Sequence, residues 1–213
     1  MAVSTKRVAI AAVSTLAIVL VATWSLTRKG QEDAFAACRT SQVMGGAGSI
    51  GGPFTLTDEN GHQVTDKDVL SKPSLVYFGY SYCPDICPTD VARNAQAVDV
   101  LEEDGYDVQP VFISVDPRRD TPQVLKEWTD GIHPKLLGLT GTPEQIRAVA
   151  KEYKTFYQVP DNPKDDNYTV EHMTQTYLML PGRGFADFFP REASADDIAQ
   201  KTSCFLEAEK GEN

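Results

Sequence analysis

The sequence predicts an α/β domain with a central mixed β-sheet flanked by helices, carried on an N-terminal transmembrane helix. Two observations predict the sheet. Strand-like and helix-like segments alternate through the middle of the 213-residue chain, and a hairpin is predicted on each side of this region. Alternating strands and helices give parallel strand pairs, whereas hairpins give antiparallel ones. A long uncharged stretch near the N-terminus predicts the membrane helix.

Composition excludes several classes of protein. The hydrophobic fraction of 41% and the charged fraction of 23% are close to globular averages, which excludes wholesale disorder. The net charge of −10 argues against a general nucleic-acid-binding protein, which needs a basic face. The four cysteines are too few for a disulfide scaffold or for two four-cysteine metal sites.

The uncharged stretch runs from Val8 to Leu26, close to the ~20 residues that span a bilayer as a helix. Two basic residues flank it on each side, so the positive-inside rule decides its orientation only weakly. The short N-terminal tail favours the tail inside and the domain outside. We therefore predict a tail and an uncleaved anchor over residues 1–29.

Two alternatives remain open for this region. Ala34-Phe35-Ala36 matches the A-x-A pattern of a signal-peptide cleavage site, although charged residues separate it from the apolar run, which is unusual for such a site. The residues leading to Cys38 also resemble a lipoprotein site, but they lie too far from the apolar run.

The N-terminal half of the soluble part begins with a linker and a hairpin. Residues 30–52 are small and glycine-rich, which predicts a linker. Phe54–Leu56 and Gln63–Thr65 flank Asn60-Gly61, a strong hairpin turn sequence. Ser74–Tyr80 follows as an apolar run that contains the β-branched Val76 and three aromatic residues, which predicts a buried strand.

Strands and helices then alternate. Val108–Val115 predicts a second buried strand and Leu136–Leu139 a short third one. Pro122 and Pro143 suit the first position of a helix, and Thr142 with Gln145 forms a capping box. Three helices are predicted, from about Thr89 to Glu103, from Thr121 to about Asp130, and from Thr142 to about Lys154.

The C-terminal part is predicted to close the sheet. A polar loop from Val159 to Thr169 precedes two strands, Thr176–Leu180 and Phe185–Phe189, joined by a turn. A last helix, capped by Ser194, is predicted to end near Glu207. The domain therefore covers residues 53–207, with 208–213 as a tail. This order of elements resembles the thioredoxin superfamily with an added N-terminal hairpin.

Cys83 and Cys87 lie where the first buried strand meets a helix, in the sequence CPDICP. We expect Pro88 to be the first helical residue and Cys87 its cap. Both sulfurs would then lie near a helix N-terminus, which favours the thiolate that binds metals and attacks disulfides. The alternatives are inert core thiols, which the polar turn disfavours, and a structural disulfide, whose small loop would add little stability.

His172 is the expected third member of this site. It lies just before the Thr176–Leu180 strand, and in the thioredoxin topology that loop packs beside the cysteine turn. Thiol oxidoreductases of this fold place a cis-proline there, but no proline lies between His172 and Leu180. Two thiolates and one imidazole suit copper, whereas structural zinc needs a fourth ligand. The remaining candidates are predicted to be surface or packing residues: His62, His133, Met44 and Met173.

Three sequence segments together resemble the SCO/SenC family over about residues 50–206: the CPDICP turn, SVDPRRDTP at Ser114–Pro122, and YTVEHMTQTYLM at Tyr168–Met179. The resemblance implies a membrane-anchored thioredoxin-like fold. It also implies one copper ion, Cu(I) or Cu(II), bound by Cys83, Cys87 and His172. Asp116 falls where the family has an acidic residue near the copper loop, and a turn-forming role before Pro117 is the open alternative.

The implied function is assembly of the binuclear copper A site of cytochrome c oxidase subunit II, by copper delivery, by reduction of that site's cysteines, or both. The implied partners are subunit II, other copper carriers, thioredoxin-like reductants and the membrane, without nucleic acid. The implied location is the bacterial inner membrane with a single pass and the domain in the periplasm, or the equivalent mitochondrial topology.

Two further functions compete with this one. The first is a thiol–disulfide oxidoreductase that uses Cys83 and Cys87 without metal, which is also open as a second activity. The second is a peroxidase, because Cys87-Pro88-Thr89-Asp90 is similar to a peroxiredoxin turn. His172 and the missing proline favour copper over the first, and Cys83, which a peroxidase does not need, disfavours the second.

Two expectations remain. Cys38 and Cys204 bracket the domain, and we predict that they pair in an oxidising compartment, which stabilises the fold by about 4–5 kcal/mol; two free thiols are the alternative. The polar loop has little to bury, so we expect it to be mobile without metal. Metal would then bind the thiolates first and recruit His172 afterwards.

Overall fold

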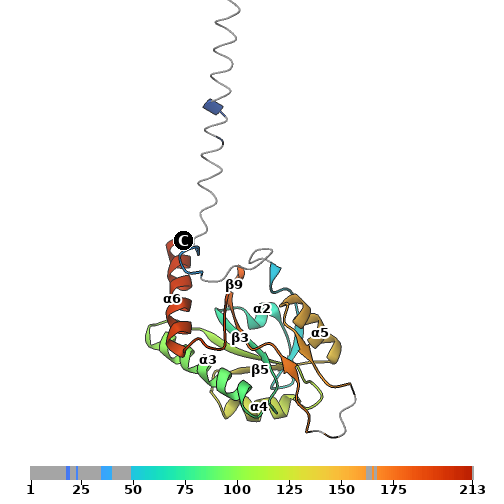
Figure 1. Cartoon of the computed structure of the whole chain (residues 1–213). Helices are drawn as coiled ribbons and strands as arrows, with labels where there is room; N and C mark the ends of the chain where they lie inside the picture. The colour runs from blue at the N-terminus through green and yellow to red at the C-terminus, as the bar shows by residue number, and fades with distance from the viewer. Residues whose placement is uncertain are drawn as a thin grey trace, which may run out of the picture.

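The computed structural model describes residues 18–19, 23, 35–39, 49–161, 165 and 167–212. A seven-stranded sheet in the order β2-β1-β5-β4-β3-β8-β9 forms the centre (Figure 1). Its strands are β1 (Thr55–Asp58), β2 (Gln63–Thr65), β3 (Ser74–Gly79), β4 (Gln109–Ser114), β5 (Leu137–Thr140), β8 (Thr176–Leu180) and β9 (Gly184–Phe189). The helices are α2 (Asp66–Val69), α3 (Ile86–Glu103), α4 (Pro122–Asp130), α5 (Pro143–Glu152) and α6 (Ala195–Glu212).

The sheet is mixed, as predicted. β4 runs parallel to both β3 and β5, because helices connect these strands. β1 is antiparallel to β2 and β5, and β8 is antiparallel to β3 and β9. The hairpins and the β-α-β units therefore lie in the parts of the chain for which the sequence predicted them.

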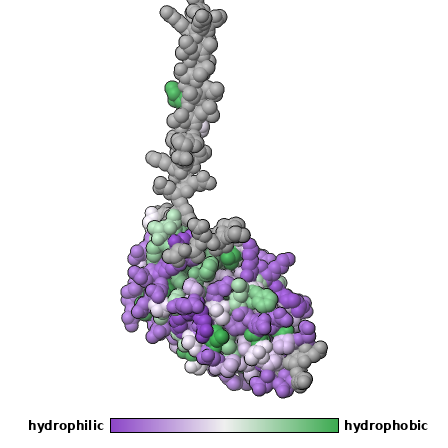
Figure 2. All heavy atoms as spheres, viewed as in Figure 1, coloured by the Kyte–Doolittle hydropathy of each residue, from purple (hydrophilic) through white to green (hydrophobic). Residues whose placement is uncertain are grey.

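Helices cover both faces of the sheet. The neighbouring residues Tyr77 and Phe112 share one face, where the Phe112 ring lies 4.6 Å from that of Trp128 in α4. Phe78 points to the opposite face, where its ring lies 5.2 Å from that of Tyr153, just after α5. α6 packs beside α3 (Figure 1). On the side shown in Figure 2 the surface is mainly hydrophilic, with small hydrophobic patches.

Two helix boundaries differ from the prediction. α3 begins at Ile86, with Asp85 as its N-cap, so Cys87 and Pro88 lie inside the first turn. The prediction that Cys87 caps the helix is therefore wrong. Proline is tolerated here because the first four N–H groups of a helix have no intrahelical partner. α6 continues to Glu212, beyond the predicted end, and its Lys210 ammonium lies 4.5 Å from the Tyr106 ring centroid.

The structure contains a short ribbon that the sequence did not predict. β6 (Tyr157–Gln158) pairs antiparallel with β7 (Glu171–His172) at the two ends of the polar loop. Tyr157 is the partner of His172 in this ribbon. Two-residue strands are too short to show an alternating hydrophobic pattern, so the prediction missed them.

Part of the predicted linker packs on the domain. The structure has a disulfide between Cys38 and Cys204, with the Cα atoms 5.8 Å apart. The Phe35 ring lies 5.3 Å from the Phe205 ring, and the Arg39 Nε donates to the Ala186 carbonyl at 3.3 Å. These contacts hold residues 35–39 against α6 and β9.

The predicted transmembrane segment lies almost entirely outside the described residues, as do residues 40–48 of the linker. Among the helices that are described, none has the length and apolar character to cross a bilayer.

Candidate metal centre

The cysteine loop connects the end of β3 to the start of α3. Gly79 ends the strand, and a Cβ built there would lie 2.8 Å from the Cys87 sulfur. Real Cβ atoms essentially never approach a heavy atom so closely, so glycine is needed for the sulfur to lie against the strand. Both Cys83 and Cys87 are free thiols in the structure.

Cys83 lies at the N-terminus of α3. The backbone N–H of Cys87 donates to the Cys83 sulfur at 3.3 Å. Burial raises the pKa of the Cys83 thiol, but hydrogen bonds from the backbone N–H groups of Cys87, Asp85 and Ile86 and from the Cys87 side chain together outweigh it and lower this pKa overall. The unpaired N–H groups at a helix N-terminus favour an anion, so Cys83 is the cysteine poised to ionise.

Cys87 lies deeper and has no exposed surface. Burial raises the pKa of its thiol well above the ordinary value. The Tyr77 hydroxyl contacts this thiol, which lowers the pKa in part, and it also donates to Asp90 Oδ2 at 3.1 Å. The pKa values of the two thiols are therefore shifted in opposite directions, although the cysteines are only four residues apart.

His172 reaches the cysteines from β7. Its Nδ1–H donates to the Met173 carbonyl at 2.9 Å, because a carbonyl oxygen can only accept. This leaves Nε2 facing the Cys87 sulfur at 3.3 Å. Burial lowers the His172 pKa, so the neutral imidazole, which is the form that binds a metal, is favoured.

Aromatic rings hold the imidazole edge-on. Its centroid lies 6.2 Å from the Tyr77 ring and 5.8 Å from the Tyr80 ring, in T-shaped contacts. The β6–β7 pairing and these rings place His172 beside the cysteines. That metal binds the thiolates first and recruits His172 from a mobile loop stays a prediction.

The three side chains form one compact donor set. The sulfur atoms of Cys83 and Cys87 and a ring nitrogen of His172 all lie within 4.8 Å of one another. In the described part of the chain, this is the one group of His, Cys, Asp or Glu side chains able to hold an ion. Two soft sulfurs and one imidazole without a fourth protein ligand fit copper better than structural zinc.

A hollow of about 440 Å³ opens beside the donor set. Its apolar wall includes Pro84 and Val170, and Asp85 and Glu171 add acidic side chains. Both Cys83 and His172 line it, so an ion or a partner's side chain can approach the ligands from solvent. No peptide bond in the described residues is cis, in keeping with the missing proline before β8.

Asp116 does not contact the donor set directly. It is 1% exposed, and its carbonyl accepts from the N–H groups of Arg119 and Asp120, as expected of a turn residue. Its carboxylate accepts from Arg119 Nε and from the Tyr168 hydroxyl. The structure therefore shows the turn role and adds a link to the segment that precedes His172.

The other candidate residues lie away from the donor set. His62 is exposed beside Asp58. His133 is partly exposed at the surface: its side chain is 12% exposed, and its Nε2 lies 3.0 Å from Oδ1 of Asp99 in α3. Met173 is 41% exposed, and Met44 lies outside the described residues.

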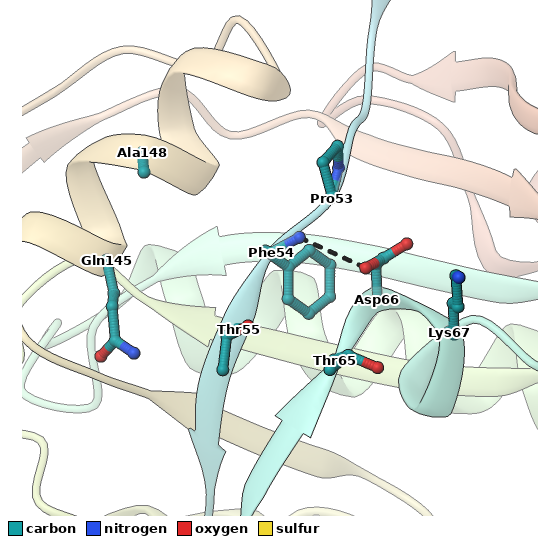
Figure 3. Close-up of a pocket in the computed structure, with 8 residues that line it drawn as sticks. All are labelled: Pro53, Phe54, Thr55, Thr65, Asp66, Lys67, Gln145 and Ala148. Carbon is teal, nitrogen blue, oxygen red and sulfur yellow. Dashed lines mark hydrogen bonds between the residues drawn. The ribbon is translucent and has the colours of Figure 1, made fainter.

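Sequence reasoning missed the residues that support the ligands, namely Tyr77, Tyr80, Asp90 and Arg119. The alternation of side chains along a strand gave one indication of the role of Tyr77. Tyr77 and Gly79 lie on the same face of β3, so both positions face α3. A second cavity, of about 480 Å³, lies between the first hairpin and α5, where the Phe54 N–H donates to Asp66 Oδ1 (Figure 3). It is lined by neither cysteine nor histidine.

Comparisons with known proteins agree with this geometry. The sequence profile described as SCO1/SenC matches residues 42–207. Protein SenC of Rhodobacter capsulatus is 54% identical over 209 residues, covering 98% of this chain and 94% of that protein. The mitochondrial protein SCO1 homolog 1 of Arabidopsis thaliana is 44% identical over 154 residues, covering 72% of this chain and 46% of that protein. The chain thus spans about half the length of the plant relative.

Solved structures show the same fold. Arabidopsis thaliana ScoI with copper bound has a TM-score of 0.70 and 41% identity, over 74% of this chain and 99% of that one. Yeast Sco1 has a TM-score of 0.71 and 37% identity, over 75% and 99%. Bradyrhizobium japonicum ScoI with copper bound has a TM-score of 0.65 and 39% identity, over 72% and 98%. The predicted thioredoxin-like α/β fold is confirmed.

Proposed function

This chain belongs to the SCO1/SenC family, and we propose that it is a copper-binding assembly factor for cytochrome c oxidase that acts on the binuclear copper A site of subunit II. The observation that carries the proposal is the donor set of Cys83, Cys87 and His172, whose ligand atoms lie within 4.8 Å of one another. Copper-bound structures of two similar proteins support the same cargo.

The donor set suits transient copper binding. Two thiolates hold Cu(I), and the imidazole adds a ligand that either oxidation state accepts. Three protein ligands leave copper coordinatively open, and the hollow beside Cys83 and His172 admits a ligand from a partner. Copper can therefore pass to an incoming sulfur or nitrogen ligand by stepwise exchange.

Metal titration tests the ligand assignment. We expect the purified, reduced domain to bind one copper per chain, and the Cu(II) form to show a sulfur-to-copper charge-transfer band. Alanine at Cys83, Cys87 or His172 should weaken binding, whereas the matched control His62→Ala, at an exposed histidine, should not. Unchanged Cu(II) affinity and spectrum in His172→Ala would overturn the assignment.

We place the domain on the outer side of a bacterial inner membrane, anchored by residues 8–26, or in the equivalent mitochondrial topology. The uncharged segment and the Cys38–Cys204 disulfide, which requires an oxidising compartment, support this location. Fractionation and thiol labelling in intact cells test it. Recovery of the full chain in the cytoplasm with Cys38 and Cys204 reduced would contradict it.

A second candidate function is reduction of the partner's disulfide. The free, ionisable Cys83 at the start of α3 favours it. The Cys83 thiolate attacks one sulfur of the partner's disulfide, which breaks the partner's S–S bond, releases its other sulfur as a thiolate and forms a mixed disulfide. The Cys87 sulfur, after losing its proton, then attacks the Cys83 sulfur and releases the partner's second sulfur. The partner gains two electrons and two protons as thiols, and Cys83 and Cys87 become a disulfide.

The test is stoichiometric reduction of the oxidised, metal-free copper A domain of subunit II. The variant His172→Ala should retain this reaction while copper binding weakens, and Cys83→Ser should abolish it. If the partner's cysteines stay oxidised in the presence of the reduced wild-type domain, the reductase role is excluded.

A further inference from the structure

The two parts of the donor set come from distant segments of the chain. The cysteine loop spans residues 80–87, and the histidine lies at the end of residues 168–172. A third segment, Asp116–Asp120, contributes no ligand atom to the group of three. Its side chains nevertheless contact both of the others.

Asp120 binds the cysteine loop. Its side chain is fully buried, and its carboxylate accepts from the Ser81 N–H at 3.0 Å and from the Ser81 hydroxyl at 2.5 Å. It also accepts from the Ser114 hydroxyl at the end of β4. Asp120 therefore fixes the start of the cysteine loop to the sheet.

Arg119 binds the segment that leads to His172. Its Nη1 donates to the Tyr168 carbonyl at 2.9 Å, and its guanidinium carbon lies 3.6 Å from the centroid of the Tyr168 ring. The same guanidinium faces the Tyr80 and Tyr82 rings of the cysteine loop at 5.4 and 4.9 Å. The Arg119 guanidinium thus contacts both the cysteine loop and the segment that leads to His172.

Asp116 anchors this cation and the aromatic ring beneath it. One carboxylate oxygen accepts from Arg119 Nε, and the other accepts from the Tyr168 hydroxyl at 2.9 Å. Arg119 is 8% exposed and Asp116 is 1% exposed. A buried ion pair of this kind is rigid, because moving one charged side chain away leaves the other charge buried without a partner.

We propose that Arg119, anchored by Asp116, is the positioning residue for His172: it binds the 168–172 segment to the cysteine loop and so sets where Nε2 lies relative to the two sulfurs. This inference rests on the proposed copper-binding role. Tyr80, which the Arg119 guanidinium faces, extends these contacts to His172. Its hydroxyl accepts from the Val170 N–H, and its ring contacts the His172 ring edge-on.

The proposal predicts different effects on the two oxidation states. Cu(I) is held mainly by thiolates, whose loop is fixed by Asp120 and by α3. Cu(II) depends more on the imidazole. Arg119→Gln should therefore weaken Cu(II) binding about tenfold, the lower end of the effect of losing a residue that orients a ligand. Its Cu(I) affinity should stay within about twofold of wild type.

A double-mutant cycle tests whether Arg119 acts through His172. Cu(II) affinity and the charge-transfer spectrum are measured for wild type, Arg119→Gln, His172→Ala and the double variant. Arg119→Gln should weaken Cu(II) binding in the wild-type background and have no further effect when His172 is absent. Equal loss in both backgrounds, or no loss in either, would overturn the proposal.

Controls separate positioning from general destabilisation. Arg147→Gln removes an exposed arginine that pairs with Glu144 and should change neither affinity. Tyr168→Phe removes only the hydroxyl that bonds Asp116 and should give a smaller loss of the same kind, so the test survives if Arg119→Gln folds poorly. In the metal-free protein, amides 170–173 should exchange hydrogen faster in Arg119→Gln, whereas amides of β4 should not. Unchanged exchange at 170–173 would count against the proposal.

The same data distinguish this inference from the proposed function. If wild type binds no copper, or if His172→Ala binds Cu(II) as wild type does, the proposed function fails. If His172→Ala weakens Cu(II) binding but Arg119→Gln does not, only the positioning role fails.

Discussion

Gly79 and Cys87 are in direct contact, because the sulfur of Cys87 occupies the place where a side chain at position 79 would begin. A Cβ at Gly79 would lie 2.8 Å from that sulfur, and 2.9 and 3.0 Å from ring carbons of Tyr77 and Phe112. Cys87, a proposed copper ligand, can therefore occupy its position only because Gly79 at the end of β3 has no side chain. This relationship leads to the first prediction.

Gly79→Ala should move Cys87 and weaken the site. Overpacking of a buried position costs about 1–3 kcal/mol, and the displaced sulfur should lower copper affinity as well as stability. Urea unfolding and copper titration measure the two effects. Gly131→Ala is the matched control, because that glycine has an ordinary helical conformation and its added Cβ would lie 3.4 Å from its nearest neighbours. Wild-type affinity and stability in Gly79→Ala would contradict the argument.

The two cysteines should react at different rates with alkylating agents. The Cys83 pKa is lowered and the Cys87 pKa is raised, so between pH 7 and the ordinary thiol pKa near 9.0 Cys83 is the more ionised. Because the thiolate is the nucleophile, iodoacetamide should modify Cys83 first in the reduced, metal-free domain. Mass spectrometry of the peptides reports the order. Both cysteines should react alike in concentrated urea, and preferential modification of Cys87 in the folded domain would contradict the assignment.

Sequence patterns predicted the sheet well because its strands are long enough to show buried runs, and the capping residues Thr121 and Thr142 mark α4 and α5. Cys83 and Cys87 were found because the CPDICP turn is local in sequence, whereas His172, 85 residues from Cys87, was found because the thioredoxin topology places the loop before β8 beside that turn. The β6–β7 ribbon could not be found, since its pairing joins residues separated by a polar loop. An arginine is expected at the surface from sequence alone, so the role of Arg119 could not be predicted. Its contacts with Tyr168 and Tyr80 arise only from tertiary folding.

Tyr77→Phe should weaken copper binding by a similar factor at every pH from 6 to 9. The Tyr77 hydroxyl contacts Cys87 and lowers the pKa of that buried thiol in part. Without it, the Cys87 pKa rises further, so more work is needed to remove the proton that copper must displace. Because this thiol is protonated throughout that pH range in both proteins, the Cu(I) affinity of the variant should be lower than that of wild type by a constant factor.

The contacts of Asp90 and a control variant separate this effect from misfolding. Asp90 keeps its ion pairs with Arg93 and Arg191 in Tyr77→Phe, so the helix start should remain in place. Tyr106→Phe removes an exposed hydroxyl that bonds Glu207, and it serves as the control. Coincident pH profiles for wild type and Tyr77→Phe would show that the hydroxyl does not act on Cys87.

The disulfide between Cys38 and Cys204 should stabilise the domain without affecting the proposed copper site. The bridge joins residues 166 positions apart, and closing so long a loop stabilises the native state by about 5 kcal/mol in the chain-entropy model. In a Cys83→Ser/Cys87→Ser background, a reductant acts on this bridge alone. The free energy of unfolding in urea should then differ by several kcal/mol with and without reductant, and Phe35→Ala should remove a further part of the contact with Phe205.

The Cys38→Ser/Cys204→Ser variant should keep wild-type copper affinity, because residues 35–39 pack on α6 and β9 rather than on the cysteine loop. Equal unfolding curves in the two redox states would show that the bridge adds no stability, and lost copper affinity would show that it reaches the metal site.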